Sequence, residues 1–294
     1  MSKIAFIILH YLTTEETIKC VESINSLECN DSELFTIIVD NASPNQSGTI
    51  LLDRYKDDDG ITVILNGNNS GFSNGNNLGI SYAKEHIDPD YYIVANNDVQ
   101  FLQNDILVQI VNEYRESQFD VLGPDIYNTR LHVHQSPLRN TVPSLAEVNR
   151  TIRLNKIVCN TYPFSYPLMW LEKRKEANIT DAVGYDRRQD DVSLYGACLI
   201  FSKKYVERRM SSNEEKKVFY PETFLYYEEA LMMLWNTKND AKSVYSPKLK
   251  VNHAESVATE KDSKNQTNRW YRGARNIIDS ASIYREKLLK YNKE

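Results

Sequence analysis

Apolar residues form short continuous runs over residues 1–125 of this chain, and amphipathic stretches separate the runs. Runs of this kind predict strands that are buried on both faces of a parallel sheet. The predicted strands cover residues 4–9, 35–39, 61–65, 91–95 and 120–122. The predicted helices cover residues 13–27, 50–55, 71–84 and 104–116. Strands and helices that alternate with short connections indicate an α/β fold with a mostly parallel, doubly wound sheet.

This alternation is lost after residue 125. Residues 132–166 are predicted to be irregular, because prolines interrupt them. Further strands are predicted at residues 192–201, 244 and 249–251, and further helices at 228–235 and 266–290. No internal repeat or low-complexity linker is visible. We therefore predict one domain over residues 1–264, with halves at 1–125 and 126–264, and a helical extension over 265–294.

Composition narrows the class of protein. The formal net charge of -5 over 294 residues argues against a general nucleic-acid binder, which needs a strong positive field. The cysteines form no CxxC, and their spacing suits neither a zinc site nor a disulfide framework. They are Cys20, Cys29, Cys159 and Cys198. We expect free thiols in a reducing cytosol. No apolar run reaches the length of a transmembrane helix, and the first run lacks the flanks of a signal peptide.

Acidic residues follow two of the predicted strands, at the edge where an α/β sheet places its ligands. Asp40 follows the strand at 35–39, and its carboxylate can accept from a base or a ribose hydroxyl. Asp98 follows the strand at 91–95 in the triplet Asn96-Asn97-Asp98, and a carboxylate there suits Mg²⁺ or Mn²⁺ held against a diphosphate. A simple turn or helix cap is the alternative at both places.

Asparagine and glycine are concentrated in residues 66–77. Glycines let the backbone approach a ligand closely, and the helix that follows presents N–H groups toward anions. The stretch contains neither GK[ST] nor GxGxxG, so it is neither of the two common phosphate-binding loops. An ordinary flexible loop is the alternative. Phe72 and the core-spaced Leu78, Ile80 and Ala83 that follow it favour a ligand-binding loop.

Two adjacent acids, Glu228 and Glu229, begin a predicted helix. Adjacent helical residues point about 100° apart, so one of the two faces a given site. That acid is either a general base, with a pKa set by burial among aromatic residues, or an acid favoured at a helix start. His253 ends the strand at 249–251 as a metal ligand or a satisfied polar group. His132 and His134 would share one face of an extended segment, as a metal-binding pair does, but the irregular sequence around them favours a structural role.

Together these segments resemble the inverting family 2 glycosyltransferases with a GT-A fold. The most similar branch is the bacterial rhamnosyltransferase-like group that builds O-antigen, capsule and other cell-surface polysaccharides. The resemblance covers residues 3–275, and its most specific parts are residues 40–43, 69–80 and 271–276. The Asn-x-Gly-Phe stretch made by Asn69, Gly71 and Phe72 is the strongest single signature.

The resemblance implies a nucleotide-binding half (1–125), an acceptor-binding half (126–264) and a role for each motif. The nucleotide-sugar site would be formed by His10, Tyr11, Asp40, Asn69, Gly71, Phe72, Asn76, Asn97, Gly196 and Ala197. Asp98 and His253 would hold Mn²⁺ or Mg²⁺. Glu229 would take the proton from an acceptor hydroxyl, which attacks the anomeric carbon from the face opposite the nucleotide and inverts its configuration. The donor would be dTDP-rhamnose or a UDP-hexose, and the acceptor a lipid-linked or oligosaccharide glycan.

Two positions depart from the family's pattern. Asn96 and Asn97 stand where an acid or proline is common, which leaves one carboxylate for the metal. Glu229 stands where the family usually has Asp, which lengthens the base by one methylene. Either the acceptor hydroxyl lies farther from the helix, or Glu228 is the base and Glu229 only caps the helix.

Other functions remain open at this point. A nucleotidyltransferase would also bind a sugar nucleotide and a metal, but residues 10–14 lack its glycine-rich, basic loop. A non-catalytic sugar-nucleotide-binding scaffold would fit the two departures. The C-terminal segment 269–294 is basic with an apolar side, so it either lies on an anionic membrane surface or packs as a terminal helix. We expect a cytoplasmic protein, free or peripheral at the inner face of the membrane.

Overall fold

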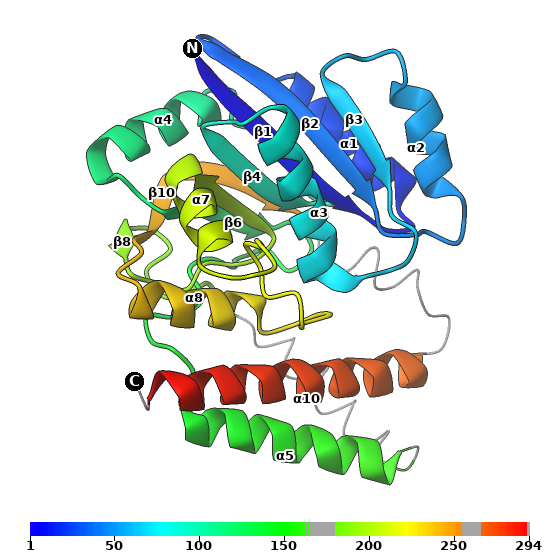
Figure 1. The fold of residues 1–294 in the computed structure, drawn as a ribbon, viewed down its shortest axis with the longest axis vertical. Coiled ribbons are helices and arrows are strands. Elements are labelled where there is room, and N and C mark those ends of the chain that lie inside the picture. Colours follow the sequence, from blue (N-terminus) through cyan, green and yellow to red (C-terminus); the bar gives the residue numbers. More distant parts are fainter. Residues whose placement is uncertain (163, 165–179, 255–265, 293–294) are drawn as a thin grey trace.

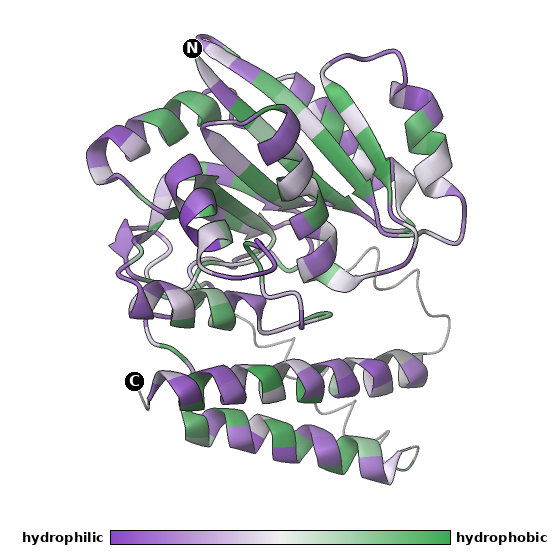
Figure 2. Ribbon diagram, in the orientation of Figure 1, coloured by the Kyte–Doolittle hydropathy of each residue, from purple (hydrophilic) through white to green (hydrophobic). Residues whose placement is uncertain are grey.

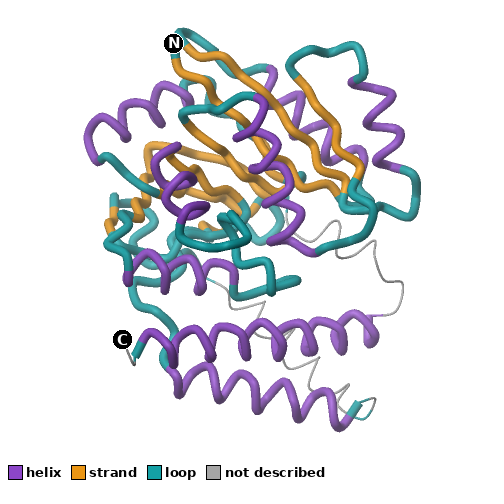
Figure 3. The backbone as a smooth tube through the Cα atoms, viewed as in Figure 1, coloured by secondary structure: helices purple, strands orange, loops and turns teal. Residues whose placement is uncertain are grey.

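The structure is a computed structural model, and it describes residues 1–162, 164, 180–254 and 266–292. A mixed, mostly parallel sheet forms its centre, in the order β3-β2-β1-β4-β9-β6-β10-β5, with β7 beside β6 and β8 beside β10 (Figures 1 and 3). The strands are β1 (Ser2–His10), β2 (Ser32–Asp40), β3 (Ile61–Leu65), β4 (Tyr91–Asn96), β5 (Val99–Gln100), β6 (Val121–Asn128), β7 (Val133–His134), β8 (Gln189–Asp190), β9 (Cys198–Ser202) and β10 (Ser243–His253).

Helices cover both faces of this sheet, which confirms the predicted α/β class. Ile4, Phe6 and Ile8 of β1 pack on the face covered by α1 and α4. Ala5 and Ile7, the alternate residues, pack on the face covered by α3, α7 and α8. A strand that is buried on both faces carries apolar residues on both, and Figure 2 shows hydrophobic (green) bands along the central strands. The helices are α1 (Thr14–Asn25), α2 (Ser47–Tyr55), α3 (Gly71–His86), α4 (Ile106–Ser117), α7 (Lys203–Ser211) and α8 (Glu228–Lys238).

Two further helices, α5 (Leu145–Thr161) and α10 (Gln266–Tyr291), lie side by side and pack on α8 (Figure 1). Their shared core contains Val148 of α5, Leu231 of α8 and Leu288 of α10. Ile278 and Ile283 of α10 also face this core. Most of the apolar side of α10 is therefore used in packing within the protein. In the part of the chain that the structure describes, no helix combines the length and apolar character that crossing a membrane requires.

The second half departs from the sequence prediction in three places. Helix α5 lies in the segment predicted to be irregular, and Ser144 and Glu147 form a capping box at its start. The strand predicted over 192–201 is limited to β9, and α7 directly after it was not predicted. The two short strands predicted near 244 and 249–251 are one strand, β10, with a register shift between Ser246 and Lys250.

Candidate functional site

Several predicted site residues meet at one edge of the sheet, where the parallel strands end. Leu9 of β1 is in register with Asn96 of β4, and the Asn96 N–H donates to the carbonyl of Ala197 at 2.9 Å. His253, at the end of β10, pairs with Val99. The topology therefore brings together segments that are far apart in the sequence, at the edge where open α/β sheets bind ligands.

A cavity of about 580 Å³ opens beside this edge, and we call it the donor cavity. Four of the ten predicted nucleotide-sugar residues line it: Tyr11, Asn69, Gly71 and Phe72. The segment before α8 and helix α10 supply the opposite walls. Their lining residues are Phe224, Leu225, Tyr226, Arg272, Gly273, Arg275, Asn276 and Asp279.

Asn41 organises the loop of the donor cavity, a role that was not predicted. Its Nδ2 donates to Asn69 Oδ1 at 3.0 Å and to the Gly71 carbonyl at 3.1 Å. Its Oδ1 accepts from the Ser70 N–H at 3.1 Å and from Asn66 Nδ2 at 3.2 Å. Both N–H groups and the oxygen of this buried amide therefore have hydrogen-bond partners in the loop. The available signal was its position directly after β2, beside Asp40.

Gly71 lets the segment before α8 dock against this loop. Its φ is +80°, and a Cβ at this position would lie 2.3 Å from the carbonyl oxygen of Phe224. That carbonyl accepts from the Phe72 N–H at 2.8 Å. The first turn of α3 is therefore partly satisfied by protein, rather than left wholly open to an anion as the sequence suggested.

His10 and Asn97 form a buried network beside the donor cavity and do not line it. His10 is fully buried, with Nδ1 at 2.6 Å from Thr17 Oγ1 and Nε2 at 2.8 Å from Ser47 Oγ. Burial lowers the pKa of His10 to about 4, so it is neutral. Asn97 Nδ2 donates to Thr13 Oγ1 at 2.7 Å and to Thr17 Oγ1 at 2.8 Å. These hydrogen bonds connect the ends of β1 and β4 to the start of α1.

Asp40 and Asn76 are also held by protein contacts. Asp40 is buried and accepts from the Ser43 N–H at 3.2 Å, and a Cβ on Gly48 would lie 2.2 Å from its carboxylate. Asn76 is fully buried, and its Nδ2 donates to the Phe72 carbonyl at 3.0 Å. Contact of these two side chains with a nucleotide sugar stays a prediction.

Asp98 and His253 face each other at the sheet edge. Asp98 Oδ1 lies 3.3 Å from His253 Nε2, and both side chains are largely buried. Gln135 Oε1 lies 2.8 Å from His253 Nδ1. In the neutral tautomer with the proton on Nδ1, Nε2 turns a lone pair toward the carboxylate, and the two atoms could then share a cation.

The separation of the two atoms fits a divalent cation. Neighbouring ligands in an octahedron of Mg²⁺ are about 3 Å apart. Among the described residues no cluster of three or more His, Cys, Asp or Glu side chains could hold a metal. A metal at Asp98 and His253 would therefore complete its coordination with water or with oxygens of a phosphorylated ligand.

The two acids at the start of α8 have different surroundings. Glu229 Oε1 accepts from the Gly196 N–H at 3.2 Å, and a Cβ on Gly196 would lie 2.6 Å from that oxygen. Glu228 is buried, and its Oε1 has no hydrogen-bond partner. Burial, and then the charge of Glu229, raises the pKa of Glu228 to about 8. Burial also raises the pKa of Glu229, but the Gly196 N–H opposes this. Of the two acids, Glu229 is thus the one whose carboxyl group accepts a hydrogen bond from the Gly196 N–H.

A strained turn leads into these acids. Tyr226 and Tyr227 are consecutive, and both have left-handed backbones, with φ of 73° and 68°. This conformation costs roughly 1–2 kcal/mol for each residue with a side chain. Strained backbone conformations of this kind are often found at functional sites, where they hold side chains in particular orientations.

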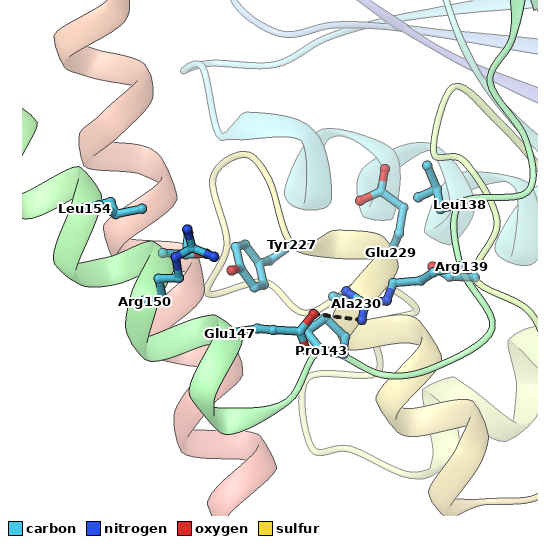
Figure 4. Close-up of a pocket in the computed structure, with 11 residues that line it drawn as sticks. Leu138, Arg139, Pro143, Glu147, Arg150, Leu154, Tyr227, Glu229 and Ala230 are labelled. Atoms are coloured by element: carbon cyan, nitrogen blue, oxygen red, sulfur yellow. Dashed lines mark hydrogen bonds and ion pairs between the residues drawn. The ribbon is translucent and has the colours of Figure 1, made fainter. Parts of the chain in front are cut away.

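A second cavity, of about 550 Å³, lies on the far side of this turn, and we call it the helical cavity. Glu229, Tyr227 and Ala230 line it from the start of α8 (Figure 4). Arg150 and Leu154 line it from α5, and Figure 4 shows Arg150 extending toward Tyr227. Arg139 pairs with Glu147 at 3.1 Å across its lower wall.

His132 and His134 have protein partners. His132 Nδ1 lies 3.2 Å from Tyr127 Oη, and His134 Nδ1 lies 2.7 Å from Asp125 Oδ1. The His134 ring also stacks on Tyr185. These contacts agree with a structural role.

The family model for glycosyl transferase family 2 matches residues 6–178. The chain belongs to this family. Two curated relatives are each 28% identical to this chain over the matched residues. The low-salt glycan biosynthesis hexosyltransferase Agl10 of Haloferax volcanii matches over 102 residues, 34% of this chain and 31% of Agl10. The uncharacterized glycosyltransferase EpsJ of Bacillus subtilis matches over 134 residues, 46% of this chain and 35% of EpsJ. The matches thus span about a third of the length of these relatives.

Solved structures confirm the predicted GT-A fold. S. aureus TarS 1–349 in complex with UDP has a TM-score of 0.53 and 11% identity, over 94% of this chain and 69% of TarS 1–349. The mannosyltransferase PcManGT from Pyrobaculum calidifontis, in complex with GDP-Man and Mn²⁺, has a TM-score of 0.51 and 9% identity, over 96% of this chain and 73% of PcManGT. At these identities the likeness concerns the fold alone.

Sequence reasoning placed Arg272 and Arg275 in the basic C-terminal segment and not in the nucleotide-sugar site, although both line the donor cavity. They lie in the 271–276 stretch that carries part of the family resemblance. Gly196 was predicted as part of the floor of a sugar site. The structure adds that its missing side chain makes room for Glu229.

Proposed function

We propose that the protein is an inverting glycosyltransferase that moves a sugar from a nucleoside-diphosphate sugar to a hydroxyl of a growing bacterial cell-surface glycan. The observation that carries this is the position of Glu229. Its carboxylate is held by Gly196 beside the turn that separates the donor cavity from the helical cavity. A base between two substrates is the arrangement that a single displacement with inversion needs.

The donor cavity would bind the nucleotide sugar. Phe72 and Tyr226 offer aromatic surfaces for a base or a sugar ring, and Tyr11 and Asn69 offer polar groups. Arg272 and Arg275 supply positive charge from α10 for the diphosphate. The rhamnosyltransferase-like resemblance favours dTDP-rhamnose. The hexosyltransferase name of one relative and the UDP bound to TarS favour a UDP-hexose instead.

In the proposed reaction, Glu229 takes the proton of the acceptor hydroxyl. Glu228 stays protonated near neutral pH, because its buried carboxyl has a pKa of about 8. Asp98 and His253 would hold Mn²⁺ or Mg²⁺, and Gln135 would orient His253. When bound, the metal would stabilise negative charge on the leaving diphosphate. The Mn²⁺ in the PcManGT complex supports a divalent cation in this fold.

Substitution of each acid tests the assignment. We expect Glu229→Gln to lower kcat by about 10²–10⁴-fold, the usual contribution of a general base, and Glu228→Gln to retain most activity. The measurement is release of nucleoside diphosphate from a donor found by thermal-shift screening of nucleotide sugars with Mn²⁺, and NMR of the product reports the inversion. Full activity in Glu229→Gln, with loss in Glu228→Gln, would make Glu228 the base.

Two controls address the remaining claims. Addition of EDTA should abolish transfer and Mn²⁺ should restore it. Full activity in EDTA would remove the metal from the proposal. A protein that neither transfers nor hydrolyses any nucleotide sugar would instead be the non-catalytic scaffold.

The acceptor-binding half is proposed to be residues 126–264, followed by the helical extension at 265–294. For a lipid-linked acceptor, the enzyme would work at the inner face of the cell membrane. Co-sedimentation of the full chain with anionic vesicles, compared with neutral vesicles, tests this location. Equal recovery in the supernatant from both kinds of vesicle would argue for a protein that is free in the cytoplasm.

A further inference from the structure

A third cavity, of about 260 Å³, lies between α7, α8 and α10, and we call it the α7 cavity. Arg209 lines it from α7, Trp235 from α8 and Lys287 from α10, and residues of the segment 212–222 complete its walls. Among the described residues, none lines both this cavity and either of the other two. Sites for drug-sized ligands measure roughly 300–1,000 Å³, so the α7 cavity suits a smaller ligand than a nucleotide sugar.

Arg209 puts a buried positive charge on the wall of the α7 cavity. The residue is 4% exposed, and its Nε and Nη2 donate to the Val218 carbonyl at 2.9 and 2.6 Å. Its guanidinium carbon lies 4.6 Å from the centre of the Trp235 ring and 5.0 Å from that of Tyr220. The rings stabilise the charge, but a guanidinium has five N–H groups. Among the described residues, two of the five have an acceptor and no carboxylate pairs with the group.

Two lysines add positive charge to the same cavity. Lys217 lines it from the loop and Lys287 from α10. Lys287 Nζ lies 2.7 Å from Glu222 Oε1 and 5.0 Å from the centre of the Tyr220 ring. The acids that line the cavity in the described part of the chain, Glu215 and Glu222, are both exposed. The buried charge is therefore positive and the acids lie in water, which favours an anion as the ligand.

Hydrogen bonds within the protein hold the walls of the α7 cavity in place. Asn213 Oδ1 accepts from the Lys217 N–H at 2.9 Å, and Asn213 Nδ2 donates to the Lys217 carbonyl at 2.9 Å. Asn77 Oδ1, on α3, accepts from the N–H groups of Val218 and Phe219 at 3.1 and 2.9 Å. The binding groups are thus already assembled, so a ligand need not order the loop when it binds.

We propose that the α7 cavity binds a small anion with a phosphate group, held by Arg209, Lys217 and Lys287. A guanidinium edge matches two phosphate oxygens, and the ammonium groups add charge. The bound anion would connect α7 and the loop to α10. This loop continues into the turn before α8, so the site is placed to stabilise the segment that leads to Glu229. The proposal goes beyond the proposed function and uses none of its catalytic residues.

Thermal melts of the full chain in rising inorganic phosphate, with KCl at matched ionic strength, measure the binding without any transfer. A ligand of the native state raises Tm with its concentration. We expect phosphate to raise Tm above the KCl control, and Lys287→Gln to weaken the apparent affinity about 10-fold. Lys290→Gln is the matched control and should bind like the wild type. Lys290 also pairs with an acid, Glu286 at 3.3 Å, but is not among the residues that line the cavity.

Glu222→Gln should have the opposite effect. It removes a negative charge from the cavity and releases Lys287, so we expect phosphate to bind about 3–10-fold more tightly. A purely structural role for the pair of Lys287 and Glu222 predicts no gain in affinity. Arg209→Lys should weaken binding about 10-fold or more by loss of the planar fork. Because Arg209 also anchors Val218, the Lys287 and Glu222 variants decide the proposal if Arg209→Lys does not fold.

Arg275→Gln locates the site, because Arg275 lines the donor cavity and its loss should leave the phosphate effect unchanged. Glucose 1-phosphate identifies the source of the phosphate group: tighter binding than inorganic phosphate indicates a sugar phosphate, and equal binding indicates the free ion. A phosphate effect no larger than that of KCl would overturn the proposal. So would an effect that is lost in Arg275→Gln but kept in Lys287→Gln, equal losses in Lys287→Gln and Lys290→Gln, or weaker binding by Glu222→Gln.

Discussion

The close approach of Gly196 to Glu229 makes Gly196→Ala a precise test of the base. An added Cβ would lie 2.6 Å from Glu229 Oε1 and 3.3 Å from its Cδ. Ordinary contact begins near 3.4 Å, so the carboxylate must retreat by roughly 0.8 Å. A misplacement of about 1 Å can cost roughly 100-fold in rate, which corresponds to about 2.7 kcal/mol of transition-state stabilisation.

The same substitution should change stability little. Gly196 keeps its N–H, and replacement of glycine by alanine restricts the unfolded chain by about 0.4–1 kcal/mol, which offsets part of the strain. We expect kcat to fall about 100-fold, the donor KM to stay near the wild-type value and Tm to move by only a few degrees. Gly67→Ala is the matched control, because no atom lies within 4 Å of its added Cβ.

Steady-state kinetics with the identified donor and acceptor, together with a thermal melt of each variant, provide the measurement. The reasoning is refuted if folded Gly196→Ala retains kcat within about threefold of the wild type. In that case the position of the Glu229 carboxylate does not limit the reaction. If Gly67→Ala loses activity to the same extent, the loss in Gly196→Ala cannot be assigned to the contact with Glu229.

Three further outcomes are expected. The pKa of Glu228 is about 8 in the fold and near 4.5 when unfolded, so wild-type stability should fall as pH rises from about 4.5 to 8, by up to about 1.4 kcal/mol per pH unit from this group. Glu228→Gln should reduce this loss, and a difference in Tm between the variant and the wild type that does not grow with pH would contradict it. Gly71→Ala should lower Tm and raise the donor KM, because φ is +80° and the Cβ clashes with backbone; an unchanged KM would contradict the docked turn. Gln135→Leu should weaken Mn²⁺ binding by about 10–100-fold in calorimetry by releasing His253, and unchanged affinity would remove that role.

The first half of the fold could be predicted because each of its central strands is a continuous run of apolar residues in the sequence. Ile4, Phe6 and Ile8 pack on one face and Ala5 and Ile7 on the other, so a run of apolar residues was enough to identify β1. Helix α5 was missed because exposed Leu154 and Ile157 interrupt the pattern of one apolar face. The Ser144-x-x-Glu147 capping box was the signal that would have found it.

The site was only partly predictable, because side-chain direction is a tertiary property. Asp40 and Asn97 stand at the predicted edge, but they turn toward Ser43 and toward Thr13 and Thr17. Arg272 reaches the donor cavity only because α10 packs back on α5 and α8, which no local pattern indicates. The order of the motifs along the chain predicted which end of the sheet carries the site. The packing of the second half determines which side chains line the donor cavity.

The helical layer of α5, α8 and α10 gives the strained turn its support. Two left-handed tyrosines cost roughly 2–4 kcal/mol together, and the turn persists only if its surroundings repay that cost. On one side, the Phe224 carbonyl accepts from Phe72. On the other, the centroid of the Tyr227 ring lies 5.5 Å from that of Tyr284 of α10. Helix α10 therefore helps to hold the turn from which Glu229 extends, so loosening its contact with Tyr227 should move the base before it unfolds the sheet.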